Sequence, residues 1–197
     1  LEVDSQFGGG QPQFRIRGVG AREYSSNNAS TVGIYVDEVP HPYTVTTQGG
    51  MFDVSRLEVL RGPQGTLYGR NTTGGAISFI TRRPTATPSS GLMAEYGEHD
   101  LFRAEGYISG PLSPTMRGRL AVSTEQGGAW QRHRDTGESI GDADRLGVRA
   151  LLAWDPSDNL SLLLDVHGGV DQSESLWLYL LSDMYTRLGT GPVIPAD

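Results

Sequence analysis

From residue 91 onward, apolar and polar residues alternate along the chain in long segments. Because alternation with a period of two places every second side chain on the same face of a strand, we expect β-strands here. The expected strands are residues 92–97, 102–109, 116–125, 145–154 and 160–171. One face of these five strands is apolar or small throughout and carries no charge. The opposite face carries Arg103, Arg119 and Arg149 together with several carboxylates. The pattern predicts an antiparallel meander with two chemically different sides.

Two architectures fit such a meander: a transmembrane β-barrel and a soluble β-sandwich. The segments bracket the roughly 9–11 residues that a tilted strand needs to cross a bilayer. Residues 110–114 and 155–159 read as tight turns, whereas 126–144 is long and polar, which is the asymmetry of outer-membrane barrels. The connection at 97–100 is short and breaks that rule. We expect the start of a transmembrane barrel, with a soluble β-sandwich, as a carbohydrate-binding or interaction module, as the alternative.

The first 83 residues follow a different pattern of short strands, glycine-rich turns and one or two helical turns. A segment rich in Pro, Ser and Thr follows, which favours a boundary at that point. The expected organisation is an α+β domain over residues 1–83, a linker over 84–90, and antiparallel strands with their loops over 91–197. An open sheet of five strands facing lipid would leave unpaired strand edges. We therefore expect the chain to be part of a longer protein, with parts of both regions absent.

Composition narrows the possible functions. The chain has 197 residues, a net charge of -7 and no cysteine, so cysteine chemistry and zinc–thiolate sites are excluded. The acidic balance argues against a nucleic-acid partner. The glycine-rich segment 69–75 lacks the Lys-Ser/Thr of a phosphate-binding loop. No set of side chains indicates an enzyme, and a lone His41 does not indicate a metal site, so we expect no cofactor.

Several motifs in the first region occur in a characteristic order. They are FRIRG at residues 14–18, VGIYVD at 32–37, and LEVLRGPQGTLYGRNTTGGAISFITRRP at 57–84. Together they closely resemble the plug domain of TonB-dependent outer-membrane receptors. The resemblance implies a plug inside a β-barrel in the bacterial outer membrane and an uptake activity without covalent chemistry. The periplasmic protein TonB would supply energy through a docking segment that precedes the plug core.

The resemblance also implies roles for individual residues. A ferric siderophore is the expected ligand by frequency in the family, with cobalamin, haem, oligosaccharides and other chelates left open. Arg17 and Arg61 would pair with barrel carboxylates and lock the plug in place. The apices that face the ligand would supply the remaining site residues: Gln11, Tyr24, Asn27, His41, Tyr43 and Gln48.

Two local features complete the expectations. Asp37-Glu38 stands where relatives carry Asp-Gly, and we expect a turn other than type I′, because that type places both central residues at positive φ. Residues 173–188 change to helical spacing, with Ser173 as a possible cap. They predict an external-loop helix, with a distorted sixth strand as the alternative.

Overall fold

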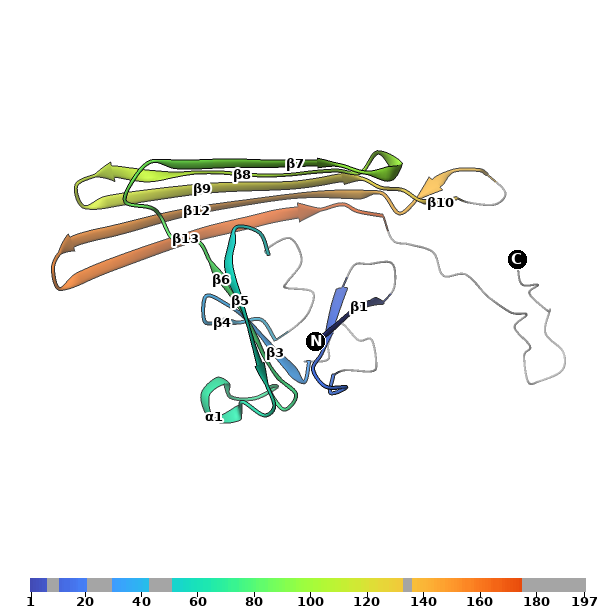
Figure 1. The fold of residues 1–197 in the computed structure, drawn as a ribbon, viewed down its shortest axis with the longest axis horizontal. Helices are drawn as coiled ribbons and strands as arrows, with labels where there is room; N and C mark the ends of the chain where they lie inside the picture. The colour runs from blue at the N-terminus through green and yellow to red at the C-terminus, as the bar shows by residue number, and fades with distance from the viewer. Residues whose placement is uncertain (7–10, 21–29, 43–50, 133–135, 175–197) are drawn as a thin grey trace.

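The computed structural model describes residues 1–6, 11–20, 30–42, 51–132 and 136–174. A small body built from the first strands lies against one side of a long sheet (Figure 1). We call the strands and the short helix up to residue 81 the N-terminal body, and the five-stranded sheet within residues 89–171 the long sheet. Within the described residues, no helix is long and apolar enough to cross a membrane.

The long sheet contains the five strands that the alternation predicts. They are β7 (Ser89–Tyr96), β8 (Phe102–Ser113), β9 (Met116–Gly127), β12 (Ala143–Ser157) and β13 (Leu160–Asp171). Each pairs antiparallel with its neighbour in the order β13-β12-β9-β8-β7. The predicted limits of β13 are confirmed, whereas β7, β8, β9 and β12 are longer than predicted, and β7 both begins and ends earlier than predicted. Strands of 12 to 15 residues exceed the roughly 9–11 that span a bilayer.

The two faces of the long sheet differ as the sequence predicts. In register, Ile108 pairs with Leu120, which pairs with Ala150 on the next strand, so these three share one face. We call this the outer face. Its exposed apolar side chains are Leu92, Ile108, Leu120, Val122, Leu146, Val148, Leu162, Leu164, Val166 and Val170. Within the five strands, charge appears on this face only at a strand end, at Asp144.

The other face of the long sheet, the inner face, carries the N-terminal body. Register places Arg119 opposite Ser109 and Leu151, and Arg149 opposite Ala121. Arg103 lies on this face as well, opposite Glu125. The predicted separation of these arginines from the apolar positions is therefore confirmed.

The N-terminal body is built on a four-stranded sheet in the order β4-β3-β6-β5. Its strands are β3 (Val32–Val36), β4 (Val39–Pro40), β5 (Val54–Arg61) and β6 (Gly75–Thr81), with the short helix α1 (Gly65–Tyr68) between the last two. β3 and β6 run parallel, and β5 pairs antiparallel with β6. A separate hairpin joins β1 (Glu2–Gln6) to β2 (Gln11–Arg15).

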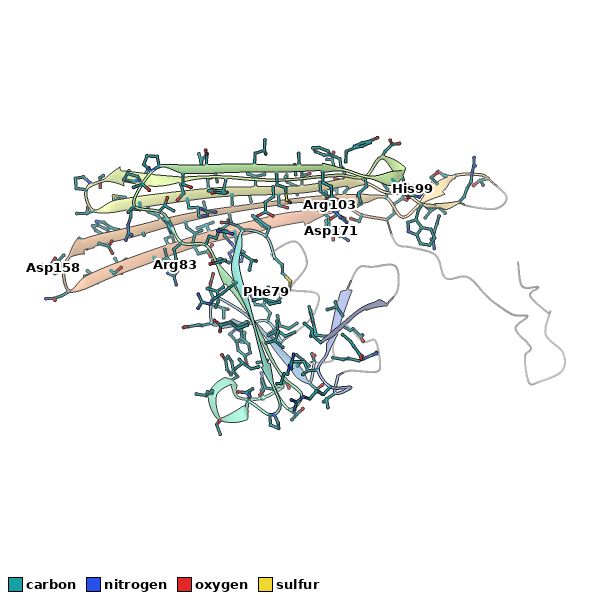
Figure 2. All side chains as sticks on the ribbon, viewed as in Figure 1. Phe79, Arg83, His99, Arg103, Asp158 and Asp171 are labelled. Carbon is teal, nitrogen blue, oxygen red and sulfur yellow. The ribbon has the colours of Figure 1, made fainter. Side chains whose placement is uncertain are left out.

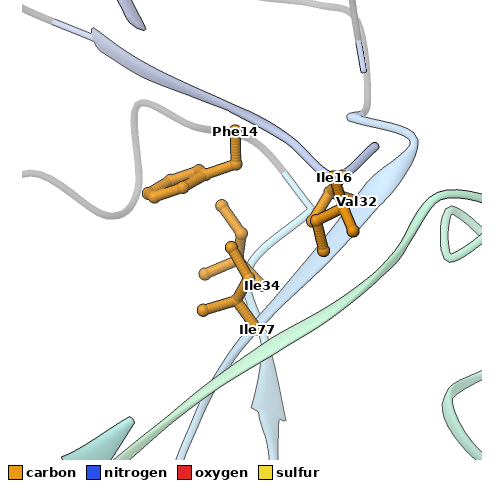
Figure 3. Close-up of a cluster of buried hydrophobic side chains, with 5 residues drawn as sticks. All are labelled: Phe14, Ile16, Val32, Ile34 and Ile77. Carbon is orange, nitrogen blue, oxygen red and sulfur yellow. The ribbon is translucent and has the colours of Figure 1, made fainter. Parts of the chain in front are cut away.

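The hydrophobic core of the body lies between the end of this hairpin and the sheet. Phe14, Ile16, Val32, Ile34 and Ile77 form one buried cluster (Figure 3). Every residue of β3 is buried, as expected for a central strand covered on both faces.

The paired glycines at residues 74–75 allow β6 to approach its neighbours closely. Gly75 has φ of 143°, and a Cβ there would lie 2.3 Å from the carbonyl oxygen of Leu60 and 2.8 Å from Cδ1 of Ile16. Only glycine fits this position without moving the backbone of β5.

The expectation for the Asp37–Glu38 turn is wrong. Val36 pairs with Val39, and both Asp37 and Glu38 have positive φ (47° and 72°), the signature of a type I′ turn. Hydrogen bonds to Asp37 stabilise this conformation. Its carboxylate accepts the Thr81 N–H at 2.9 Å and the Thr81 hydroxyl, and its own N–H donates to the Phe79 carbonyl at 3.0 Å.

The connections of the long sheet follow the predicted pattern. Two-residue turns join β8 to β9 and β12 to β13. The long connection between β9 and β12 carries a small hairpin of β10 (Gln131–Arg132) and β11 (Ser139–Ile140). A single 3₁₀ turn, η2 (Glu98–Asp100), links β7 to β8. The helix predicted over 173–188 lies outside the described residues apart from its first two positions.

Candidate functional site

The N-terminal body contacts the inner face of the long sheet through Phe52 and Asp53, just before β5. Asp53 and Arg119 form an ion pair in which each side chain is only 2% exposed. The Arg119 guanidinium donates to both carboxylate oxygens of Asp53, with an Nε–Oδ2 distance of 2.6 Å. This forked geometry is the strongest form of an arginine–carboxylate pair.

Arg119 and Asp53 also have partners within their own surroundings. The guanidinium of Arg119 lies 4.0 Å from the centre of the Tyr107 ring. The Asp53 N–H donates to Glu105 Oε1 at 2.9 Å, and Arg82 lies 3.9 Å from the Asp53 carboxylate. Polar groups on both sides of the contact are therefore paired, which burial away from water requires.

Arg149 binds Phe52, the residue of the N-terminal body that precedes Asp53. Its side chain is fully buried, and its Nη1 donates to the Phe52 carbonyl at 3.1 Å. The guanidinium also lies 5.3 Å from the centre of the Phe52 ring, and its Nε lies 3.8 Å from Asp165 on β13. The contact thus places three guanidinium groups, of Arg82, Arg119 and Arg149, near three carboxylates, of Asp53, Glu105 and Asp165.

The backbone at Asp53 is unusual. Its φ is 56°, in the left-handed region that a non-glycine residue adopts infrequently. Its N–H is held by Glu105 and its carbonyl accepts the Arg82 N–H at 3.0 Å. Such a conformation persists when surrounding contacts determine it, and it marks sites with a specific role. We call Phe52, Asp53, Glu105, Arg119 and Arg149 the seat.

The segment between β6 and β7 attaches next to the seat. The Thr85 N–H and hydroxyl each lie 2.9 Å from the Ser109 hydroxyl. Pro88 covers Gly110, where a Cβ would lie 3.2 Å from the Pro88 Cα. The N-terminal body is therefore attached to the long sheet at two neighbouring places, the seat and the segment that contains Thr85 and Pro88.

A second group of charges crosses the inner face further along the strands. Arg103, Glu125, Arg145 and Asp171 form a row over four strands, with successive nitrogen–oxygen distances of 3.2, 3.6 and 3.2 Å. Figure 2 shows Arg103 and Asp171 near one end of the long sheet, and Asp158 at the other. Each side chain in the row is 24–46% exposed. We call these four residues the charged row.

The N-terminal body has a pocket of about 310 Å³ beside α1. His41, Tyr35, Tyr68 and Arg70 contribute to its lining. The Tyr35 hydroxyl donates to the Tyr68 carbonyl at 2.6 Å, and the two rings pack edge to face with their centres 4.8 Å apart. Burial raises the pKa of the Tyr35 phenol, and the neighbouring Tyr68 raises it further. Tyr35 therefore remains a hydrogen-bond donor at neutral pH.

Four of the predicted site residues lie in the described part of the chain. Arg17 and Arg61 are both exposed. Gln11 begins β2. His41 lines the pocket, and its backbone N–H donates to the Ile34 carbonyl at 2.8 Å. The remaining predicted ligand residues lie outside the described part of the chain: Tyr24, Asn27, Tyr43 and Gln48. In the described part, no group of three or more His, Asp and Glu side chains could hold a metal ion.

Sequence reasoning missed the seat. The available signal was the pair of inward-pointing arginines, Arg119 and Arg149, which need partners from whatever covers that face. Asp53 precedes a predicted strand of the N-terminal body and is a carboxylate in an otherwise apolar stretch. Asking which acid could meet those arginines would have identified it as a candidate.

Comparison with known proteins identifies the family of the N-terminal body. The TonB-dependent Receptor Plug Domain family matches residues 1–76. Residues 1–76 belong to the TonB-dependent receptor plug domain family. The N-terminal body is accordingly called the plug below. Some relatives are named for the outer membrane, among them the ferrichrome outer membrane transporter/phage receptor of Escherichia coli and the pyoverdine outer membrane receptor FpvA.

Individual relatives agree with this assignment. The pesticin receptor of Yersinia pestis is 40% identical over 97 residues, which are 49% of this chain and 14% of the relative. The metal-pseudopaline receptor CntO of Pseudomonas aeruginosa is 31% identical over 116 residues, which are 57% of this chain and 15% of the relative. The chain thus spans about one seventh of the length of these relatives.

Solved structures show the same fold. The ferric yersiniabactin uptake receptor FyuA of Yersinia pestis superposes with a TM-score of 0.72 and 28% identity, over 80% of this chain and 25% of that one. The pyoverdine receptor FpvA of Pseudomonas aeruginosa, at 20% identity, superposes with a TM-score of 0.71 over 92% of this chain and 25% of that one. These relatives are named as receptors, and the soluble β-sandwich alternative is not supported.

Proposed function

We propose that the chain is part of a receptor that imports a ferric chelate across the outer membrane with energy delivered by TonB. The observation that carries the proposal is the division of the long sheet into two faces. A plug is seated by a buried ion pair on the inner face, while the outer face is apolar and free of charge between the strand ends. A bilayer tolerates the second face and excludes the first, since an arginine at its centre costs roughly 2–4 kcal/mol.

In this proposal, the plug extends over residues 1–83, a linker over 84–90, and the barrel region over 91–197. β7 and the four strands that follow in the long sheet would begin a barrel of about 22 strands around the plug. The open strand edges at β7 and β13 would be paired when the barrel closes, because unpaired strand edges are not stable in lipid.

The proposed ligand class is the ferric siderophore. It is supported by relatives named for ferric yersiniabactin and for pyoverdine. The proposed ligand residues remain the plug apices represented by Gln11, Tyr24, Asn27, His41, Tyr43 and Gln48. Arg17 and Arg61 are proposed to pair with carboxylates of barrel strands beyond those described, which suits their exposure in this chain.

Uptake of radiolabelled iron tests the function. In a strain lacking the receptor gene, the full-length receptor should restore uptake from at least one ferric siderophore, with ferric yersiniabactin and ferric pyoverdine as the first probes. Uptake should stop when TonB is deleted. Restoration that does not need TonB would contradict the proposal.

A paired substitution tests the ligand residues. Replacing His41 and Tyr43 by alanine should weaken binding of the transported chelate at least several-fold, because an aromatic side chain in a loop adds contact area at low entropic cost. Receptor abundance, measured by blotting, should not change, since strand pairing elsewhere sets barrel stability. Unchanged affinity would show that the barrel loops, and not these two residues, recognise the ligand.

A further inference from the structure

We infer that Asp53 is the residue that keeps the plug seated against the barrel wall, and that its charge holds the passage closed when no ligand is bound. The inference rests on the proposed function, because it requires a barrel around the plug. It adds a positioning residue that is distinct from Arg17 and Arg61. Asp53 acts through Arg119 and its neighbours and needs no contact with the ligand.

Burial is the first argument. The interior of a barrel without its plug is filled with water, so Arg119 and Arg149 would be solvated on the inner face. In the seated state, both guanidinium groups are covered, Arg119 to 2% exposure and Arg149 completely. Burying a guanidinium requires a partner in good geometry, and for Arg119 Asp53 provides a carboxylate that accepts two hydrogen bonds. Without that carboxylate, seating would bury an unpaired charge.

Position is the second argument. Asp53 precedes β5, and its carbonyl accepts the N–H of Arg82, which follows β6. One residue thus connects the ends of two adjacent plug strands to β8 through Glu105 and to β9 through Arg119. Arg149 on β12 fixes Phe52 beside it. Three neighbouring strands of the wall therefore determine where β5 and β6 lie.

The backbone of Asp53 is the third argument. The residue is held at φ of 56° by hydrogen bonds to its N–H and its carbonyl, from opposite sides of the contact. When the plug leaves the wall, the bond to Glu105 is lost, and nothing on the sheet side then holds this conformation. Seating and local geometry are consequently coupled at one residue.

The test measures leakage, which needs no ligand. Asp53→Asn keeps the size of the side chain and removes its charge. In the full-length receptor, this change should raise the fraction of unseated plug on the order of a hundredfold, because it leaves buried Arg119 without its carboxylate. The increase is read as ion conductance of the purified receptor in planar lipid bilayers and as greater susceptibility of cells to vancomycin, which intact outer membranes exclude.

A double-mutant cycle separates the pair from a general loss of packing. Arg119→Gln should also raise the conductance, whereas Asp53→Asn combined with Arg119→Gln should raise it less than the product of the two single effects. The matched control is Glu58→Gln, which breaks the exposed pair of Arg56 and Glu58 on β5 (2.6 Å, side chains 61% and 43% exposed). Its conductance should equal that of the unmodified receptor.

Folding and function are read separately from seating. Heat-modifiable migration on gels shows whether each variant has a folded barrel, and only folded receptor is placed in bilayers. A folded Asp53→Asn receptor with unchanged conductance would overturn the inference, as would single effects that simply multiply in the double variant. If no siderophore is taken up, the proposed function fails, but the conductance still decides whether Asp53 seats the plug.

Discussion

The seat and the charged row both pair arginines of the inner face with carboxylates, yet the two groups differ in environment. Asp53 and Arg119 are each 2% exposed and join two parts of the molecule. Glu125 and Arg145 are 26% and 35% exposed and join neighbouring strands of one sheet. Water screens the second group and not the first, so equal numbers of ion pairs do not contribute equally to stability. We therefore expect burial under the plug, more than pairing itself, to determine how much each arginine contributes to stability.

The largest expected effect follows removal of the buried arginine. Arg119→Ala should destabilise the seated plug by about 3–5 kcal/mol, because Asp53 remains buried without its partner. Urea denaturation of the purified receptor, followed by a probe in the plug, measures the change. A loss below about 1 kcal/mol, as an exposed pair would give, would place the seat in the same class as the charged row.

An intermediate effect is expected at Asp165 on the inner face, because this partly exposed carboxylate faces a buried arginine. Its carboxylate is 24% exposed and lies 3.8 Å from the buried Arg149. Asp165→Asn should cost about 1–3 kcal/mol of plug stability, since it removes a charge that faces a fully covered guanidinium. The same urea experiment measures it. A loss as large as that of Arg119→Ala would show that the seat extends to β13.

A small effect is expected in the charged row. Glu125→Gln removes the carboxylate that contacts both Arg103 and Arg145, at 3.2 and 3.6 Å. Because all three side chains are partly exposed, the expected loss is about 1 kcal/mol or less. Thermal unfolding of the barrel, compared with that of the unmodified receptor, measures it. An effect above about 2 kcal/mol would mean that further barrel strands or loops cover the row in the complete receptor.

The smallest expected effect is that of salt, which should weaken the ion pairs of the charged row and leave the ion pair of the seat unchanged. At 1 M ionic strength the Debye length falls to about 3 Å, which weakens exposed pairs and leaves buried pairs largely unaffected. Raising the salt concentration should therefore reduce the already small difference between Glu125→Gln and the unmodified receptor. The effect of Arg119→Ala should persist. Loss of the Arg119 effect in salt would show that water reaches the seat.

The sequence predicts the long sheet well because its signal is local. Alternation over residues 160–171 defines both ends of β13, and the phase of each strand follows from the same pattern. The motifs at residues 14–18, 32–37 and 57–84 identify the plug for a related reason, since their residue types are tied to turns and close approaches such as that at Gly75. Both kinds of information lie within short stretches of the chain.

Contacts between distant residues were not predictable in the same way. Asp53 and Arg119 are 66 positions apart, and their meeting depends on how the plug is placed on the sheet. The turn at Asp37 and Glu38 was predicted wrongly because its positive φ angles depend on Thr81, which is 44 positions away. Propensity describes the cost of such a conformation but not the distant hydrogen bonds that offset it.

The division of the long sheet into a lipid face and a plug face is the central claim, and spin-label accessibility tests it most directly. Leu164 lies on the outer face and Ser123 on the inner face, near the seat. A nitroxide attached to Leu164→Cys in the reconstituted full-length receptor should collide freely with lipid-soluble oxygen and scarcely with a water-soluble nickel chelate. A nitroxide at Ser123→Cys should show low oxygen accessibility. High oxygen accessibility at residue 123 combined with nickel accessibility at residue 164 would contradict the account.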